Sequence, residues 1–353
     1  MKSILYIDPI CNKGHIGFNN IYINALLSTD KVKIDLALPK SYANKLTINK
    51  EYNLVDIPEE LYTFNSTIFK RLSNRVKIIK IQCNIKKSIR FESYDLVLVS
   101  TFDNISLLFT RFSKNTILVC HNNIRQAFKS KMHLQFLRLL AKRYKLLVFN
   151  FDQYDFLKKN KISNAVVIPH GIREPFQTDF SEKLSHNDQK KKIFIPSSNS
   201  LDRNFVRELL ISQRLNDFLA VSNYFIYIKI PKQKSALSNV ITINRYLTKE
   251  EYKSLFIEST HILLPYDKQQ FRYRVSGVFF EAIANDKSLL IYDNGCFDWV
   301  KKHIKSVNFF SSIEELISII KVTERNNLNL DYDEFKRINS QHQIGMSLSN
   351  LIL

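Results

Sequence analysis

Residues 271–291 read FRYRVSGVFFEAIANDKSLLI, and the rest of the chain can be interpreted around this stretch. It follows an apolar run at 261–265 that predicts a buried strand, and it closes on a second apolar run. Between the two runs, apolar residues recur at the spacing of a helix that buries one face: Val278, Phe279, Ala282 and Ile283. The stretch therefore predicts a strand, a helix and a further strand in succession.

The start of this predicted helix has the chemistry of an anion site. Ser276 is a good N-cap, and Gly277 allows a ligand to approach the backbone closely. Two cations, Arg272 and Arg274, precede it, and Glu281 lies about one turn into the helix. Helix amides and guanidinium groups can hold a diphosphate, and the carboxylate can hold ribose hydroxyls. A plain strand–helix connection with a solvated basic loop accounts for the same residues.

Residues 274–284 also carry a family pattern, Arg-x-Ser-Gly-Val-x-x-Glu-Ala-x-Ala. It resembles the nucleotide-sugar signature of retaining GT-B glycosyltransferases of the GT4-like group. The resemblance implies an α/β fold of the GT-B type, with two Rossmann-like, doubly wound parallel-sheet domains facing a central cleft. The resemblance also implies that Val278, together with Ser276 and Gly277, contacts the nucleotide sugar.

Composition is compatible with two packed domains. The 353 residues are 45% hydrophobic, which suits two cores and excludes a disordered chain. No run of about 18 apolar residues occurs, so no transmembrane helix is expected. The N-terminus turns acidic at Asp8 too early for a signal peptide. The four cysteines are scattered without metal-ligand spacing, which predicts reduced thiols in the cytoplasm.

Charge is the strongest feature of the composition. The 52 Lys and Arg residues against 33 Asp and Glu give a net charge of +19. Such a chain favours nucleic acid, anionic membrane or anionic small molecules as partners. Two basic segments with apolar neighbours, 69–80 and 86–90, resemble the acceptor- or membrane-facing helices of peripheral glycosyltransferases. A solvated helix face is the alternative.

The first half alternates between strand and helix patterns, which favours a parallel, doubly wound sheet. Strands are predicted at 3–8, 33–38, 95–100, 116–120, 146–150 and 165–168. Helices are predicted at 19–27, 104–112, 131–143 and 153–159. Ligands of such sheets sit at the carboxyl ends of the strands.

Three loops at such ends carry candidate residues. Residues 9–17 hold Gly14, which resembles the first-loop glycine that lies near the donor diphosphate in GT-B enzymes; a plain turn is the alternative. His121 follows the fourth predicted strand, where GT4-like enzymes often place a histidine near the donor sugar. Residues 166–172 contain Pro-His-Gly and resemble the signature that precedes the linker of GT-B proteins.

The predicted domains follow from these patterns. An acceptor-side domain is expected at 1–172, a polar linker at 173–191 and the nucleotide-sugar domain at 192–330. A helical tail at 331–353 can cross back to the first domain, as in the resembled fold.

The second domain holds further donor candidates. Its strands are predicted at 192–196, 224–230, 240–244, 261–264 and 288–292, with helices at 203–215, 248–257, 298–305 and 312–322. Thr248 and Glu251 have capping-box spacing. The residues before this helix resemble the segment that brackets the nucleotide base: Arg245, Tyr246 and Leu247. Of the two diphosphate-binding cations of the family, only the second, Arg203, is present, and Arg272 or Arg274 would supply the other charge.

The resemblance implies the reaction. A retaining transfer from a nucleotide sugar needs stabilisation of the charge that builds on the leaving diphosphate. We assign that role to Arg203 and Arg274, with His121 and Glu281 completing the catalytic set. Cations and a helix N-terminus can act without a metal, so neither a metal nor a cofactor is expected. Tyr273 replaces the first of the family's two glutamates, the one that contacts the sugar, and it would border the sugar instead.

The expected function is therefore transfer of a sugar from a nucleotide-diphosphate sugar to a glycan or lipid-linked acceptor, in bacterial surface polysaccharide synthesis of the capsule or O-antigen type. The expected location is cytoplasmic or peripheral on the inner face of the membrane. Three alternatives stay open. They are a sugar-nucleotide-binding GT-B protein without activity, an inverting transferase or UDP-sugar epimerase, and a basic nucleic-acid-binding protein. No helix-turn-helix, zinc or RNA-binding pattern appears, so nucleic acid is not the expected partner.

Overall fold

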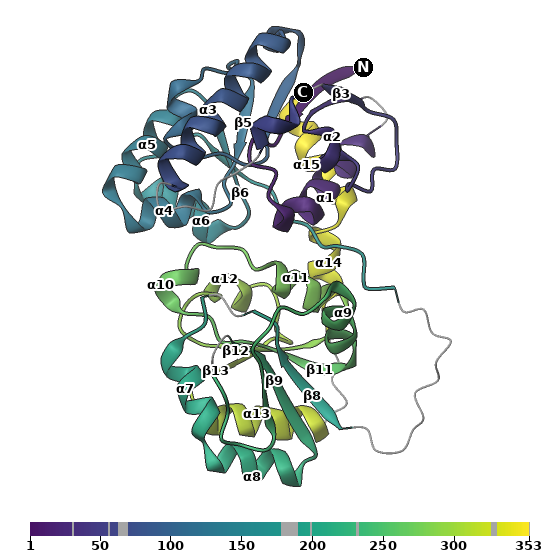
Figure 1. Cartoon of the computed structure of the whole chain (residues 1–353), viewed down its shortest axis with the longest axis vertical. Helices are drawn as coiled ribbons and strands as arrows, with labels where there is room; N and C mark the ends of the chain where they lie inside the picture. Colours follow the sequence, from purple (N-terminus) through teal and green to yellow (C-terminus); the bar gives the residue numbers. More distant parts are fainter. Residues whose placement is uncertain are drawn as a thin grey trace. The chain divides into compact units, whose positions relative to one another are not determined.

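The computed structural model describes residues 1–29, 32–55, 57–62, 70–177, 190–197, 200–230, 233–325 and 330–352. The chain forms two compact units (Figure 1). The first comprises Met1–Gly171, Tyr273–Val275 and Arg337–Leu353, and the second comprises Ile172–Arg272 and Ser276–Lys336. Most of the predicted linker, residues 178–189, lies outside the described residues.

The first unit is built on a parallel sheet with the strand order β3-β2-β1-β4-β5-β6-β7 among its described residues. Its strands are β1 (Lys2–Ile7), β2 (Val32–Ala37), β3 (Asn53–Val55), β4 (Leu96–Val99), β5 (Thr116–Val119), β6 (Lys145–Val148) and β7 (Ala165–Val167). The central strands β4 and β5 are fully buried because helices cover both faces of the sheet. This order is that of a Rossmann-like sheet.

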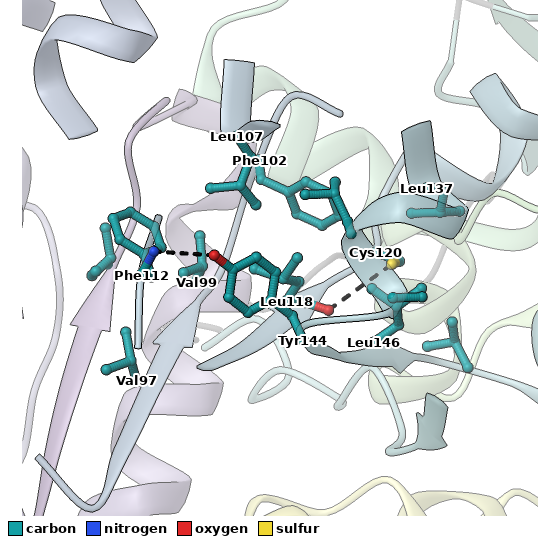
Figure 2. Close-up of a cluster of buried hydrophobic side chains, with 14 of the residues drawn as sticks. Val97, Val99, Phe102, Leu107, Phe112, Leu118, Cys120, Leu137, Tyr144 and Leu146 are labelled. Atoms are coloured by element: carbon teal, nitrogen blue, oxygen red, sulfur yellow. Dashed lines mark hydrogen bonds between the residues drawn. The ribbon is translucent and has the colours of Figure 1, made fainter. Parts of the chain in front are cut away.

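Helices cover the two faces of this sheet separately. One face packs on α3 (Lys70–Ser88), the 3-10 helix η4 (Ser106–Phe109), α4 (Asn123–Lys129), α5 (Lys131–Ala141) and α6 (Phe151–Lys159). Figure 2 shows part of this core, in which the Tyr144 hydroxyl accepts a 3.1 Å hydrogen bond from the Phe112 amide. The other face packs on α1 (Ile16–Leu27), α2 (Lys40–Ala43) and the C-terminal α15 (Gln341–Ile352).

The second unit repeats the arrangement, with the strand order β10-β9-β8-β11-β12-β13 among its described residues, all parallel. Its strands are β8 (Lys191–Ile195), β9 (Tyr224–Lys229), β10 (Val240–Ile243), β11 (Ser259–Leu264), β12 (Ser288–Tyr292) and β13 (Asn308–Phe310). Its helices are α7 (Arg203–Ile211), α8 (Gln213–Val221), α9 (Lys249–Glu258), α10 (Lys268–Phe271), α11 (Gly277–Ala284), α12 (Asp298–Lys301) and α13 (Ile313–Arg325), and α14 (Asp333–Ile338) leads on to α15.

The predicted fold class of two Rossmann-like parallel sheets is confirmed, but several predicted elements differ. Residues 104–112 do not form an α-helix, because Asp103 accepts the amides of Ile105 and Ser106 and Thr110 is already extended. The predicted helix at 203–215 is two helices, because Ser212 ends α7 and caps α8. The helix expected at 298–305 ends at Lys301.

Both sheets have a switch point, where strand order reverses and ligands of such folds bind. In the first unit it lies between β1 and β4, and the Thr101 hydroxyl donates a hydrogen bond to Asp8 across it. In the second unit it lies between β8 and β11, where Leu201 and Tyr266 form a β-bridge. Residues that contact a ligand are therefore expected among those that directly follow these strands.

Candidate functional site

The N-terminus of α11 has the geometry expected of an anion site. Ser276 is the N-cap, and its hydroxyl accepts the amide of Phe279 at 3.2 Å. The Tyr266 hydroxyl lies 3.1 Å from the same oxygen and fixes it from the end of β11. Gly277 is exposed, and a side chain at this position would meet nothing within 4 Å. The first two helix amides, those of Gly277 and half-buried Val278, therefore begin the helix at an open surface.

The three residues before Ser276 pack with the first unit. The Tyr273 ring lies against Phe128 and Phe156, with ring centroids 5.3 and 4.9 Å away. Its carbonyl accepts a 3.0 Å hydrogen bond from Gln153, and its φ of 61° is a left-handed conformation that a tyrosine rarely adopts. Packing and the hydrogen bond hold this strained residue in place, and half-buried Arg274 follows it directly.

Glu281 is engaged on both carboxylate oxygens. Arg173 donates to Oε1 at 2.8 Å, and the Tyr252 hydroxyl donates to Oε2 at 2.8 Å. Burial raises the pKa of Tyr252 well above its ordinary value, and the adjacent carboxylate raises it further. The tyrosine therefore stays a neutral donor. Glu281 lies on α11 as predicted, but these two protein partners already orient it, so a ribose would join an existing network.

The other predicted diphosphate cations belong to the second unit. Arg203 is exposed at the first position of α7, whose N-cap Asp202 accepts the amides of Asn204 and Phe205. Arg272 is half-buried at the C-terminal end of α10. In the resembled family the first diphosphate-binding cation stands where this chain has Ser197 and Ser198, and the structure describes only Ser197 of the two.

A hollow of about 450 Å³ lies beside the predicted base segment. It is lined by β10, by Asn244, Arg245 and Leu247, and by one side of α9. Arg245 pairs with Glu251 through two hydrogen bonds of 2.7 and 2.5 Å, and these lower the pKa of Glu251 to about 2. The capping box of Thr248 and Glu251 is present as predicted. Tyr246 is 85% exposed, and the Lys229 ammonium lies 4.6 Å from its ring centroid.

In the first unit, a buried carboxylate organises the loop after β1. Asp8 is fully buried and accepts the amides of Ile10 and Cys11 at 3.1 and 2.9 Å. The Asn19 amide group donates to its other oxygen at 2.9 Å. These bonds hold the loop that carries exposed Gly14 and half-buried His15. Sequence inspection missed Asp8 as an organising residue, although its position at the end of a buried strand was a usable signal.

Three histidines from separate strand ends gather in this unit. His121 stacks on His15, with ring centroids 4.5 Å apart, and His170 lies 6.4 Å from His121 by the same measure. Burial lowers the pKa of His121 well below its ordinary value, and the two neighbouring imidazoles lower it further. His121 Nε2 and His15 Nδ1 are buried without a hydrogen-bond partner. Burial also lowers the pKa of His15, so His15 and His121 are both suited to the neutral form.

The Pro-His-Gly motif ends the first unit in a turn that requires glycine. Gly171 has a φ of +93°, and a side chain there would lie 2.6 Å from Ile21. The Tyr22 hydroxyl donates to the Pro169 carbonyl at 2.7 Å. The turn and this hydrogen bond therefore explain the Pro-His-Gly motif without any ligand.

Metal ligation was not expected from the sequence. Within the described ranges, no three His, Cys, Asp or Glu side chains group as potential ligands. Two aspartates separated by one residue could suggest a metal site at the start of α14. There Asp331 and Asp333 are exposed and Tyr332 between them is fully buried. The Tyr332 hydroxyl donates to the Lys287 carbonyl at 3.0 Å, so the triplet has a packing role in the second unit.

No protein-family model matches the chain, and no curated protein is similar enough in sequence to be matched. Solved structures do match. The crystal structure of TarM has a TM-score of 0.66 at 12% identity, over 100% of this chain and 99% of that chain. HepE of Anabaena in complex with UDP-glucose has a TM-score of 0.60 at 12% identity, over 99% of both chains.

A structure of another activity matches over the same length. UDP-GlcNAc 2-epimerase from Neisseria meningitidis bound to UDP-GlcNAc has a TM-score of 0.56 at 11% identity, over 100% of this chain and 99% of that chain. Identities this low show the fold alone. The chain therefore has the GT-B fold, with two Rossmann-like units in one polypeptide.

Proposed function

We propose that this protein is a glycosyltransferase that moves a sugar from a nucleotide-diphosphate sugar to a glycan or lipid-linked acceptor. The observation that carries the proposal is the open N-terminus of α11, with Arg272 and Arg274 in the residues just before it, on a GT-B fold. Two solved structures of this fold, those of HepE and of the Neisseria epimerase, carry UDP-glucose and UDP-GlcNAc. A role in surface polysaccharide synthesis belongs to the same proposal.

The proposed transfer requires stabilisation of the negative charge that builds on the leaving diphosphate. Backbone amides at a helix N-terminus and guanidinium groups are well suited to it, since both donate charge-favoured hydrogen bonds to phosphate oxygens. In the proposed mechanism, the amides of Gly277 and Val278 and the side chains of Arg203 and Arg274 serve this role. Because these groups supply positive charge themselves, the transfer is proposed to need no metal. Retention of configuration is proposed separately, from the resemblance of residues 274–284 to the retaining GT4-like signature.

The remaining predicted residues take supporting roles in the proposal. Glu281 holds ribose hydroxyls, and the backbone of 245–247 contacts the base at the hollow beside β10. His121, kept neutral by its surroundings, contacts the sugar as an uncharged donor or acceptor. Of these roles, that of Glu281 is best supported, because Arg173 and Tyr252 hold its carboxylate in place.

The test is ligand-induced stabilisation followed by turnover. Thermal-shift measurements with UDP, GDP, TDP and CMP, each free and as sugar conjugates, report which nucleotide binds the native state. We expect one nucleoside diphosphate to stabilise the protein and its sugar conjugate to be consumed when an acceptor is added. Absence of any nucleotide response would contradict the proposal.

A second function has one specific observation in its favour. Tyr273 occupies the place of the family glutamate that contacts the sugar, and its ring packs against Phe128 and Phe156. A protein that binds sugar nucleotides without transferring sugar fits this substitution. Nucleotide-induced stabilisation without turnover on any acceptor would favour it over the enzyme.

A further inference from the structure

The positive charge of this protein is concentrated in one part of the chain. Residues 70–145 contain 17 Lys and Arg against 3 Asp and Glu, so they carry +14 of the net charge of +19. One of the three acids, Asp103, is paired with Arg75 at 3.4 Å. The segment's helices α3, α4 and α5 cover the same face of the first sheet (Figure 1), and η4 packs in the same core.

The outer sides of these helices also expose apolar side chains. Leu72 and Val76 on α3 are 67% and 46% exposed, and Phe109 at the end of η4 is 71% exposed. Met132 and Leu139 on α5 are 54% and 48% exposed. Leu72 and Val76 are four residues apart, and Met132 and Leu139 are seven apart, so each pair lies on one stripe of its helix.

These stripes lie on one surface. Ile81 and Ile85 of α3, Leu107 of η4 and Leu137 of α5 are buried in one core against the sheet (Figure 2 labels the last two). Both α3 and α5 contact η4, which therefore joins them. Since the inward sides share one core, the outward sides all face away from the sheet on the same side of the first unit, and we call them together the α3–η4–α5 face. Exposed lysines accompany the apolar side chains: Lys80, Lys86 and Lys87 on α3, and Lys131 and Lys142 at the ends of α5.

We propose that the α3–η4–α5 face docks on an anionic lipid bilayer. Lysines attract the charged headgroups, and protruding Leu, Val, Phe and Met side chains enter the boundary between headgroups and acyl chains. A nucleic acid would be held by the same charge, but four of the five exposed apolar side chains named above are Leu, Val or Met, and only Phe109 offers a ring on which a base can stack. Among the described residues, no helix has the length and hydrophobicity to cross a bilayer, so the contact is peripheral.

This inference deepens the proposed function by naming where a lipid-linked acceptor would be met. It also reaches beyond the sequence, which marked basic segments within 69–90 and gave no role to Phe109, Met132 or Leu139. Phe69 itself is outside the described residues. The test uses binding without any sugar nucleotide, so it can fail while the transferase proposal stands.

The experiment is co-sedimentation of the full chain with vesicles of phosphatidylcholine alone or mixed with phosphatidylglycerol. We expect binding to the mixed vesicles and at least about tenfold weaker binding to phosphatidylcholine alone. The combined variant Leu72→Ser, Phe109→Ser and Met132→Ser should lose about tenfold or more on mixed vesicles but keep its affinity for duplex DNA, a soluble polyanion. The combined variant Lys80→Glu, Lys87→Glu and Lys142→Glu should lose roughly a hundredfold on both.

The matched control is Val221→Ser. Val221 is 90% exposed at the end of α8, more than any residue of the triple, but it belongs to the second unit. Its substitution should leave vesicle binding unchanged, and circular dichroism confirms that each variant folds. The proposal is overturned if the wild-type protein binds vesicles with phosphatidylglycerol no more strongly than vesicles of phosphatidylcholine alone. It is equally overturned if the apolar triple binds mixed vesicles as well as the wild type, because the face then acts as a general polyanion surface.

Discussion

Arg173 Nη1 lies 2.8 Å from Glu281 Oε1, which ties the first residues of the second unit to the middle of α11. The Glu281 side chain is 14% exposed and Arg173 is 40% exposed, so the pair is partly shielded. Phe176, three residues on, donates its amide to Asn285 at the end of the same helix at 2.8 Å. The segment thus fixes the helix whose N-terminus we assign to the diphosphate.

Glu281→Gln tests whether this carboxylate also binds ribose. We expect nucleoside diphosphate to bind about tenfold more weakly, while inorganic pyrophosphate, which lacks ribose, keeps its affinity. Stability should fall by about 1 kcal/mol through the weakened contact with Arg173. Calorimetric titration of both ligands checks the difference. Glu258→Gln is the matched control, since Glu258 pairs with Lys192 in the same unit; equal losses for both ligands would mean that Glu281 only positions α11.

Gly277→Ala tests the close approach of a ligand to the α11 amides. The added methyl group meets open space, and alanine favours a helix by about 1 kcal/mol over glycine, so stability should hold or rise slightly. If a diphosphate contacts the amides, the methyl group stands in its way, and nucleotide affinity should fall at least about tenfold. A thermal melt and a nucleotide titration give the two readouts. Unchanged affinity would remove the amides from the proposed site.

Gly345→Ala makes the same change in the opposite environment. A side chain at Gly345 of α15 would lie 2.4 Å from the Ala25 carbonyl oxygen on α1, and backbone cannot move aside cheaply. We expect a loss of about 1–3 kcal/mol from overpacking the contact between α1 and α15. Urea unfolding measures it, with Gly277→Ala as the matched control. A loss under about 0.5 kcal/mol would mean that α15 packs less closely on α1 than described.

The histidine cluster predicts how stability depends on pH. The pKa values of His121 and His15 are lowered in the folded protein, mainly by burial, from an ordinary value of 6.5. Below about pH 6.5 the unfolded chain therefore binds protons that the folded protein does not, and stability falls as pH falls. Above that pH, neither state binds these protons, and this contribution is constant.

The measurement is urea unfolding from about pH 5 to about pH 8, with each unit of pKa depression worth about 1.4 kcal/mol. In the double variant His15→Gln and His121→Gln, the slope of stability against pH should flatten below pH 6.5, whatever the absolute stability. An unaltered slope in this variant would show that the cluster does not titrate as described.

Local patterns predicted most of the second unit because its signals are short-range. The helical period at 278–283, the Ser276 cap and the capping box of Thr248 each depend on residues within a few positions, and all three occur in the structure. Prediction was wrong at 104–112, where the side chain of Asp103 competes for backbone amides and turns the chain before a helix can form. It also missed the three-residue strands β3 and β13, which hold only two apolar residues each, whereas β7 is equally short but lies in the apolar run at 165–168.

By itself, the sequence determined the class of fold, the cap of α11 and the excess of positive charge. Periodicity and capping depend on residues a few positions apart, and net charge depends on composition alone. Only the tertiary structure decided which distant groups meet. It set Arg173 and Tyr252 on Glu281 and stacked His15 on His121. It also packed α3, η4 and α5, which carry Leu72, Phe109 and Met132, on one face of the first sheet. The physical reason is that these contacts join residues from separate strands and helices, and only packing against a common sheet brings such residues within reach of one another.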